Sequence, residues 1–406
     1  MPSLRRNIVY QFLYELLIVF IPLFTIPYVS RVLGAENIGL FSYTYAVANY
    51  FVLFANLGIK NYGSRTIAMV RNNKEELNRN FSEILSIHII FSIIVIFVYL
   101  VLLFFFVEDN LVIFLIQSIY VFAAVFDINW FFFGIEKFKL TVGRNTLVKI
   151  LSVFLVLVFV KTQTDLWIYA LILALSVFVG QSVVWFALKQ YVSWRRPSWA
   201  NMKQHIRPLF VLFLPILALS LYKYMDKIML GSISSNVQVG FYENAEKIIN
   251  VPMSLIMAFG VVLMPRIANM VTSKDKGEVF KLIDMSMEAV MLLAIAISFG
   301  LAGISFVLAP IFFGYEFEEC GILIMGLAVT VPFMAFANVI RTQYLIPYKE
   351  DKIFVVSLFL GAAVNLIVNI ILIPYMAARG AVIGTIFAEI IVCIYQSYFV
   401  RKKIFI

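Results

Sequence analysis

Three ionisable side chains share one face of an otherwise apolar segment. Lys223, Asp226 and Lys227 are spaced i, i+3 and i+4, which places them on the same side of a helix. A charge inside a bilayer costs at least about 2.5–3.5 kcal/mol, so such residues normally face a cavity or a partner. The functional interpretation is a site with one net positive charge, suited to an anion. The structural alternative is that Asp226 neutralises one lysine while the remaining charge snorkels to the membrane surface.

Single carboxylates lie in three other apolar segments, at Glu15, Asp127 and Glu389. A buried carboxylate tends to be protonated or paired, and it can change protonation when its surroundings change. Together with Asp226, these residues are the candidates for coupling H⁺ or Na⁺ to movement across a membrane. For Asp127, a structural pairing with a neighbouring lysine stays open as the alternative.

Other basic and metal-binding residue types are less informative. Arg31 ends the first apolar segment on the side opposite to most basic residues, which makes it a further candidate anion-binding cation. His205 lies among basic residues of a polar connection, where we expect it to be solvated. With two histidines, two cysteines and no HExxH motif, the chain is predicted to hold no metal. Arginines at the basic ends of other segments are interpreted as topology signals: Arg65, Arg266 and Arg341.

The elements that carry these residues are hydrophobic segments, each long enough to span the ~30 Å core of a bilayer. Twelve such segments occur, at roughly 8–30, 38–58, 81–107, 111–134, 146–160, 166–188, 208–231, 238–263, 285–313, 320–340, 353–375 and 380–400. Lys and Arg gather in every second gap and at both ends, the pattern of parts that face the cytoplasm. The sequence therefore predicts an all-α integral membrane protein with twelve transmembrane helices and cytoplasmic N- and C-termini.

Composition excludes several classes of function. The chain is 63% hydrophobic and 14% charged, whereas soluble proteins are about 25% charged. Its net charge of +9 follows the topology, which favours loops facing anionic lipids over nucleic-acid binding. It contains no GxxxxGK phosphate-binding loop, and its longest polar connections, of about 20 residues, are too short for a catalytic domain. We therefore expect no cofactor and no enzymatic activity. The first segment lacks a cleavage site and is expected to remain as a helix.

A weak internal repeat divides the chain into halves. In the first half, Leu33-Gly34 is followed by Gly39-Leu40-Phe41. In the second, Leu230-Gly231 is followed by Gly240-Phe241-Tyr242. Six segments per half is an even number, so both halves start on the same side of the membrane and form a parallel repeat. The predicted domains are residues 1–200 and 201–406, each a bundle of six helices.

Prolines occur at matching places in the two halves. Pro22 and Pro27 lie in the first segment and Pro215 lies in the seventh. Proline removes a backbone hydrogen bond and bends a helix, and interrupted helices at matching places in two repeats point to a transport site. We predict that these prolines are hinges. The alternative is that they are simply tolerated, as in many membrane helices.

Several motifs resemble those of bacterial polysaccharide-unit flippases. These are the Wzx-type O-antigen and capsule transporters of the multidrug/oligosaccharidyl-lipid/polysaccharide exporter superfamily. The similarity extends from about residue 10 to 400, and the first hairpin carries it most specifically. The matching stretches are 26–43, 58–65, 127–130 with 134–136, and 224–231.

The resemblance implies two six-helix bundles around a central cavity that opens to one side of the bacterial cytoplasmic membrane at a time. It implies a substrate of short oligosaccharide on undecaprenyl pyrophosphate, moved from the inner to the outer leaflet for surface polysaccharide synthesis. In that setting Arg31, Lys223 and Lys227 would line the cavity and bind the pyrophosphate. The partners implied are the lipid-linked oligosaccharide, membrane lipids and polysaccharide polymerase machinery.

Two other functions stay open from the sequence. A multidrug or cation antiporter of the same fold group would favour a cavity rich in carboxylates, whereas Arg31, Lys223 and Lys227 are basic. A membrane glycosyltransferase or polysaccharide polymerase would need a large outer loop with catalytic carboxylates or arginines. No predicted outer loop of this chain is long.

Overall fold

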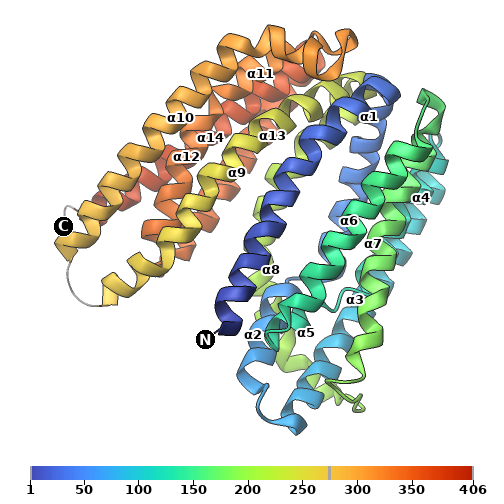
Figure 1. Cartoon of the computed structure of the whole chain (residues 1–406), viewed down its shortest axis with the longest axis vertical. Helices are drawn as coiled ribbons and strands as arrows, with labels where there is room; N and C mark the ends of the chain where they lie inside the picture. Colours follow the sequence, from blue (N-terminus) through green and yellow to red (C-terminus); the bar gives the residue numbers. More distant parts are fainter. Residues whose placement is uncertain (1, 273–275, 405–406) are drawn as a thin grey trace. The chain divides into compact units, whose positions relative to one another are not determined.

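The chain is helical almost throughout (Figure 1). This computed structural model describes residues 2–272 and 276–404; the side chains of residues 2–22, 222, 261, 272, 276 and 402–404 lie outside the description. In the described part, eleven helical segments are long and apolar enough to cross a membrane. The first of them, Leu23–Val70, takes in the end of the first predicted segment and the whole of the second, because α1 (Pro2–Asn56) continues from one into the other. The predicted all-α membrane fold is confirmed.

The chain forms two compact units, each described here by itself. One comprises Met1–Thr25 and Thr44–Leu217, and the other Ile26–Tyr43 and Ala218–Ile406. Two long helices, α1 and α8 (Trp199–Ile233), contribute residues to both. The predicted halves with a boundary at residue 200 are a different partition of the chain, and their assignment as domains stays a prediction.

The first unit contains a short helix that hydropathy alone did not predict. Helix α2 (Ile59–Val70) occupies what the sequence showed only as a polar connection. Ile59, Gly63 and Ile67 are four residues apart, so they form one buried stripe that holds the helix against the core. The other elements of this unit are α3 (Lys74–Phe106), α4 (Leu111–Val125), α5 (Asn129–Gly134), α6 (Phe138–Phe159), η1 (Gln163–Asp165) and α7 (Leu166–Leu188).

An aromatic core packs against α2. Trp130 of α5 stacks on Phe81 of α3 with ring centroids 5.5 Å apart. A Cβ atom added to Gly63 would lie only 2.5 Å from the Trp130 ring, and one added to Gly134 would lie 2.6 Å from Ile67. These two glycines therefore allow α2 and α5 to pack closely.

The second unit is built from long helices and one irregular turn. Its elements after α8 are α9 (Asn236–Thr272), α10 (Lys276–Phe313), η2 (Tyr315–Phe317), α11 (Cys320–Ala328), α12 (Thr330–Val339), η3 (Ile340–Leu345), α13 (Asp351–Met376) and α14 (Ala378–Ile404). The tenth predicted segment is thus divided between α11 and α12. It continues into η3, which is a π-helical turn, a feature that frequently marks functional sites.

Residues 26–43 belong to the second unit because of two close backbone contacts. Gly34, with φ of 76°, breaks α1 into two helical segments. Beyond it, Gly39 lies so close to Asn236 that an added Cβ would overlap the Asn236 carbonyl oxygen, and a Cβ on Gly240 would overlap the carbonyl oxygen of Ala35. Gly39 and Gly240 are matching positions of the internal repeat, so the contact is reciprocal.

We expect Gly39→Ala and Gly240→Ala each to destabilise the protein by about 1–3 kcal/mol, because overpacking forces the backbones apart. In an uncrowded helix the same change stabilises by about 0.5–1 kcal/mol. Gly300→Ala is the matched control, since no atom lies within 4 Å of its added Cβ. Thermal unfolding of the purified proteins measures the difference. Equal melting temperatures for Gly240→Ala and Gly300→Ala would contradict the close contact.

Candidate functional site

Asp226 is enclosed by neutral donors from three helices of the second unit. It is 4% exposed. Its carboxylate accepts hydrogen bonds from the Tyr242 hydroxyl of α9 at 2.6 Å, from Asn369 Nδ2 of α13 at 2.5 Å and from Thr385 Oγ1 of α14 at 3.0 Å. The alternative in which Asp226 neutralises a lysine does not fit these contacts. A carboxylate buried without a basic partner favours uptake of a proton or a cation.

The surroundings of Asp226 are rich in oxygen. Asn365 Oδ1 accepts a hydrogen bond from Asn369 Nδ2 at 3.1 Å. Asn369 Oδ1 is buried, and within the described residues it has no hydrogen-bond partner. Carboxylate, amide and hydroxyl oxygens are the ligands that hard cations prefer. No group of three His, Cys, Asp or Glu side chains that could hold a metal ion occurs in the described chain.

Lys227 forms ion pairs with two carboxylates that were not predicted from the sequence as site residues. Its Nζ lies 2.6 Å from Glu243 Oε2 and 2.8 Å from Glu246 Oε2, and the residue is 7% exposed. Glu243 also pairs with Lys247 at 3.1 Å and accepts a hydrogen bond from Ser42 Oγ at 2.7 Å. Two lysines and two glutamates thus form a buried network without net charge.

A signal for this network was present in the sequence. Glu243, Glu246 and Lys247 of α9 repeat the i, i+3, i+4 spacing seen in α8. Lys227 lies six residues before Ile233, the end of α8, and Glu243 lies seven residues after Asn236, the start of α9. Residues at equal distance from a short turn lie at similar depth in two consecutive helices. The pairing of these opposite charges could therefore have been predicted from the sequence.

The remaining predicted cations have different surroundings. Lys223 is exposed, with its Nζ 5.3 Å from the centroid of the Tyr224 ring. Arg31 is also exposed, and its Nη2 donates to the Ile311 carbonyl at 2.5 Å, in the last turn of α10. A guanidinium there satisfies a carbonyl left without a partner at the helix end. Arg31, Lys223 and Lys227 all lie in the second unit, and their role in substrate binding stays a prediction.

Asp127 of the first unit lies in the break between α4 and α5. Its Oδ1 accepts hydrogen bonds from the backbone N–H of Asn129 at 3.0 Å and from Asn129 Nδ2 at 2.7 Å. Arg144 reaches the same asparagine through a 3.0 Å bond from Nη2 to Asn129 Oδ1. Asp127 therefore anchors the start of α5 through Asn129, and no bond from it to a lysine is seen in the described chain. Its coupling role stays a prediction.

Glu389 lies beside a small cavity of the second unit. The cavity has a volume of about 140 Å³ and also adjoins Arg341 and Gln396. The guanidinium of Arg341 lies 4.5 Å from the centroid of the Phe354 ring, and the residue is partly buried. An arginine that only marked the cytoplasmic side of the membrane would not need this packing. Glu389 itself is 5% exposed.

The predicted hinges lie in continuous helix. α1 continues through Pro27, and its one non-helical residue is Gly34. α8 contains Pro208 and Pro215 within its length. The side chains of Glu15 and Pro22 lie outside the described residues.

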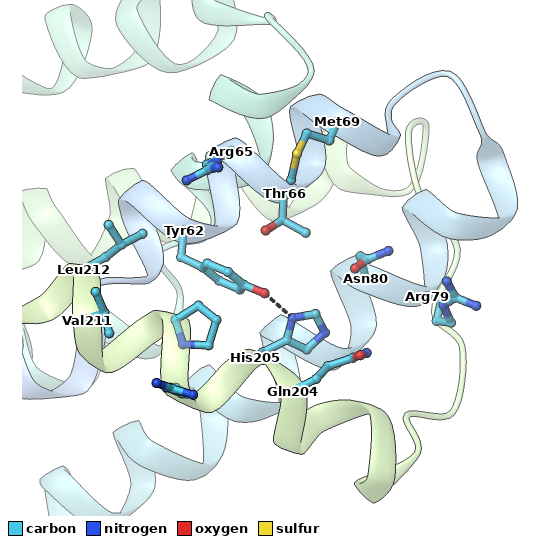
Figure 2. A pocket seen from close by; sticks show the side chains of 12 residues that line it. Tyr62, Arg65, Thr66, Met69, Arg79, Asn80, Gln204, His205, Val211 and Leu212 are labelled. Atoms are coloured by element: carbon cyan, nitrogen blue, oxygen red, sulfur yellow. Dashed lines mark hydrogen bonds between the residues drawn. The ribbon is translucent and has the colours of Figure 1, made fainter. Parts of the chain in front are cut away.

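A larger cavity lies within the first unit (Figure 2). Its volume is about 710 Å³, and it is lined by residues of α2, the first turns of α3 and the first half of α8. Tyr62 of α2 points across it toward His205 of α8, and its hydroxyl lies 2.6 Å from His205 Nδ1. Arg65, Arg79 and Arg207 also line it.

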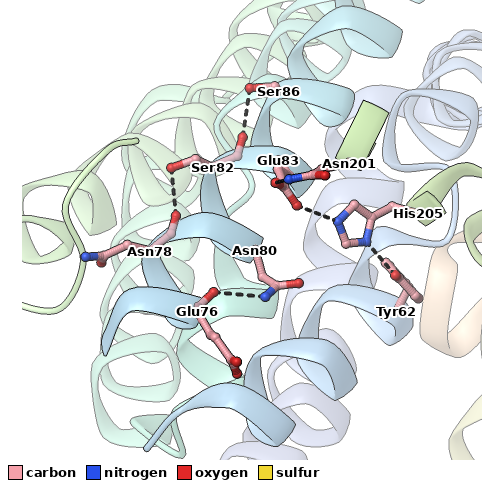
Figure 3. Close-up of polar contacts among 9 residues, drawn as sticks. All are labelled: Tyr62, Glu76, Asn78, Asn80, Ser82, Glu83, Ser86, Asn201 and His205. Atoms are coloured by element: carbon pink, nitrogen blue, oxygen red, sulfur yellow. Dashed lines mark hydrogen bonds and ion pairs between the residues drawn. The ribbon is translucent and has the colours of Figure 1, made fainter. Parts of the chain in front are cut away.

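His205 is buried, which corrects the expectation that it is solvated. It is 3% exposed, and its Nε2 lies 3.0 Å from Glu83 Oε2 (Figure 3). Glu83 is 1% exposed and accepts a second hydrogen bond from Asn201 Nδ2 at 3.0 Å. The basic neighbours of His205 in sequence suggested a surface loop, but residue 205 lies on the inner face of the first turns of α8.

Comparisons with known proteins agree with the membrane fold. A family model described as "Polysaccharide biosynthesis protein" matches residues 4–271. A "Putative O-antigen transporter" of Shigella dysenteriae is 24% identical over 97% of this chain and 99% of its own length. A protein of the same description from Escherichia coli (strain K12) is 26% identical over 99% and 97%. These relatives are described as transporters, not enzymes.

Solved structures show a shared fold. A structure of the lipid II flippase MurJ in an inward closed conformation has a TM-score of 0.76, with 15% identity and coverage of 97% of this chain and 87% of that one. An inward-facing multidrug resistance MATE family transporter has a TM-score of 0.72, with 14% identity and coverage of 97% and 98%. At these identities the similarity establishes the fold alone.

Because Lys227 forms ion pairs and Lys223 has none in the described chain, we expect the two lysines to contribute differently to the stability of the fold. We expect Lys227→Met to lower the free energy of unfolding by about 3–5 kcal/mol, because it leaves Glu246 without its cation and Glu243 with Lys247 alone. Lys223→Met, the exposed neighbour on the same helix, is expected to leave the melting temperature unchanged. Thermal unfolding without substrate measures both. If the two variants melt at the same temperature, the network around Lys227 does not hold the fold together.

Proposed function

We propose that this chain, which belongs to the polysaccharide biosynthesis protein family, moves lipid-linked oligosaccharide across a membrane. The observation that carries the proposal is the similarity to O-antigen transporters over nearly the whole chain. The described part of this chain also contains eleven helical segments that are long and apolar enough to cross a membrane. The chain is a multi-pass membrane transporter and not an enzyme.

The finer proposal concerns the substrate and its path. The substrate is an oligosaccharide on undecaprenyl pyrophosphate, carried by alternating access from the inner to the outer leaflet of the bacterial cytoplasmic membrane. The placement of basic residues supports this orientation, with both termini in the cytoplasm. Sugars and pyrophosphate are too polar to cross lipid unaided, whereas the polyprenyl tail stays in the lipid.

Lys223 is the predicted cation best suited to contact the pyrophosphate. It is exposed and has no acidic partner in the described chain. Lys227 would have to leave Glu243 and Glu246, and Arg31 would have to leave the Ile311 carbonyl. Lys227 and Arg31 remain in the proposal as ligands that become free only if those contacts open during transport.

The prolines support a hinge in each half. α1 passes from one compact unit to the other between Thr25 and Ile26, and α8 does so between Leu217 and Ala218. Pro27 and Pro215 each lie within two residues of those crossings. A bend at these places would let each unit move as a body. Normal transport rates in both Pro27→Ala and Pro215→Ala would remove the hinge proposal.

Reconstituted vesicles test the function. We expect the purified protein to deliver a fluorescent undecaprenyl-pyrophosphate oligosaccharide to the opposite leaflet, where a membrane-impermeant glycosidase can cleave it. Lys223→Met should slow delivery about tenfold, the effect of losing one charged hydrogen bond, and Lys223→Arg should retain most of the rate. Cleavage no faster than in protein-free vesicles would exclude flipping of this substrate.

Asp226 is the candidate that couples transport to an ion, because its enclosure holds a carboxylate without a basic partner. We expect delivery in the same vesicles to respond to an imposed pH or Na⁺ gradient, and Asp226→Asn to abolish that response. Asp127→Asn is the comparison, because Asp127 anchors α5 in the other unit. Loss of the response in Asp127→Asn but not in Asp226→Asn would assign the coupling to Asp127 instead. A wild-type rate indifferent to both gradients would remove coupling altogether.

A further inference from the structure

Three arginines without acidic partners surround the cavity of the first unit. Arg65, Arg79 and Arg207 come from α2, α3 and α8 and line a space of about 710 Å³, the size of a small-molecule site. None of the lining residues is Asp or Glu. Within the described chain, no ion pair involves any of the three guanidinium groups.

Two other arginines of this unit have acidic partners. Arg71, just after α2, pairs with Glu136 at 2.5 Å, and Arg195 pairs with Glu75 at 2.8 Å. The cavity differs because the three arginines that line it have no ion pair in the described chain. Such a cluster raises the local concentration of anions, and planar guanidinium groups match the geometry of phosphate oxygens.

Glu83, which contacts the lining residue His205, does not itself line the cavity. Glu83 is buried behind His205, and its two oxygens accept from Asn201 and contact His205 Nε2 (Figure 3). Tyr62 completes the chain on the other side of His205. Because Tyr62, Glu83 and His205 each lie within four residues of one of the arginines, this buried chain positions the helices that carry them.

Part of the remaining wall is apolar, since Met69, Pro208, Val211 and Leu212 line the cavity beside the polar residues Thr66, Asn80 and Gln204. Met69 and Val211 are 68% and 57% exposed, which is high for such side chains. In the view of Figure 2, Met69 lies on α2 beyond Arg65 and Val211 on α8 opposite Tyr62. A ligand that contacts both the arginines and the apolar side chains carries a phosphate group next to a hydrocarbon chain. A soluble phosphate would leave the apolar walls uncovered, so the occupant is a lipid with a phosphate-bearing head.

We propose that this cavity is a docking site for the diphosphate head of a polyprenyl lipid, on the side of the membrane that the basic residues assign to the cytoplasm. The identity of the lipid rests on the proposed function, whereas the recognition of its phosphate rests on the arginines. Lys223 is not among the residues that line this cavity, and it belongs to the other unit. It would collect the substrate before transport begins.

Binding without transport tests the proposal. The full chain in neutral phosphatidylcholine nanodiscs is titrated with undecaprenyl diphosphate, and retention is measured by native mass spectrometry. A Lys223→Met background removes the other proposed phosphate ligand. In that background we expect Arg65→Gln, Arg79→Gln and Arg207→Gln each to weaken binding about tenfold. Arg195→Gln, which removes an arginine paired outside the cavity, should bind like the background.

Three results would overturn the proposal. The first is loss of all binding in the Lys223→Met background, and the second is equal binding by the cavity variants and Arg195→Gln. The third is that the cavity variants reduce retention of phosphatidylglycerol as much as, or more than, they reduce retention of undecaprenyl diphosphate. The last result would make the cavity a site for bulk anionic lipid. Failure of the vesicle experiment with intact arginine-dependent binding would instead reject the transport function and leave the docking site standing.

Discussion

The second unit depends on the reciprocal contact of two glycines. Gly39 and Gly240 bring two backbone segments so close that no side chain fits between them. That contact seats residues 26–43 against the start of α9, where Ser42 donates a hydrogen bond to Glu243. Glu243 in turn holds Lys227. The position of a buried charge in α8 therefore depends on a glycine more than 180 residues earlier in the chain.

Helix α8 carries two adjacent buried charges whose partners differ. Successive residues of an α-helix point about 100° apart, so Asp226 faces Asn369 of α13 while Lys227 faces Glu243 of α9. Lys227 meets full negative charges, and separating them is costly in a medium of low dielectric constant. In the described chain Asp226 accepts hydrogen bonds from neutral donors, which can reorient when a proton or a cation arrives. This difference is why we expect Lys227 to stabilise the fold and propose Asp226 as the residue that exchanges a proton or a cation.

Basic residues at the polar ends of the helices also divide into two kinds. Hydropathy and the positive-inside pattern treat Arg65 and Arg71 alike, since both follow the second apolar segment. In the folded chain Arg71 has Glu136 as a partner, whereas Arg65 faces a cavity without carboxylates. The basic residues behind the net charge of +9 thus include some with an acidic partner and others, such as Arg65, that have none in the described chain.

The sequence by itself determined the membrane class, the helical segments, the internal repeat and the residues worth examining, because a bilayer imposes length and hydropathy on every crossing segment locally. It placed Asp226 and Lys227 correctly on a helix and marked the repeat at Gly39 and Gly240. Only the tertiary structure decided the partners: the glutamates around Lys227, the burial of His205 and the membership of residues 26–43 in the second unit. Partners are chosen by the packing of helices that are far apart in sequence. That packing depends on the shapes of the helix surfaces, down to the absence of a single Cβ. Apart from the matching charge spacing of α8 and α9, no local pattern of hydrophobicity or charge records it.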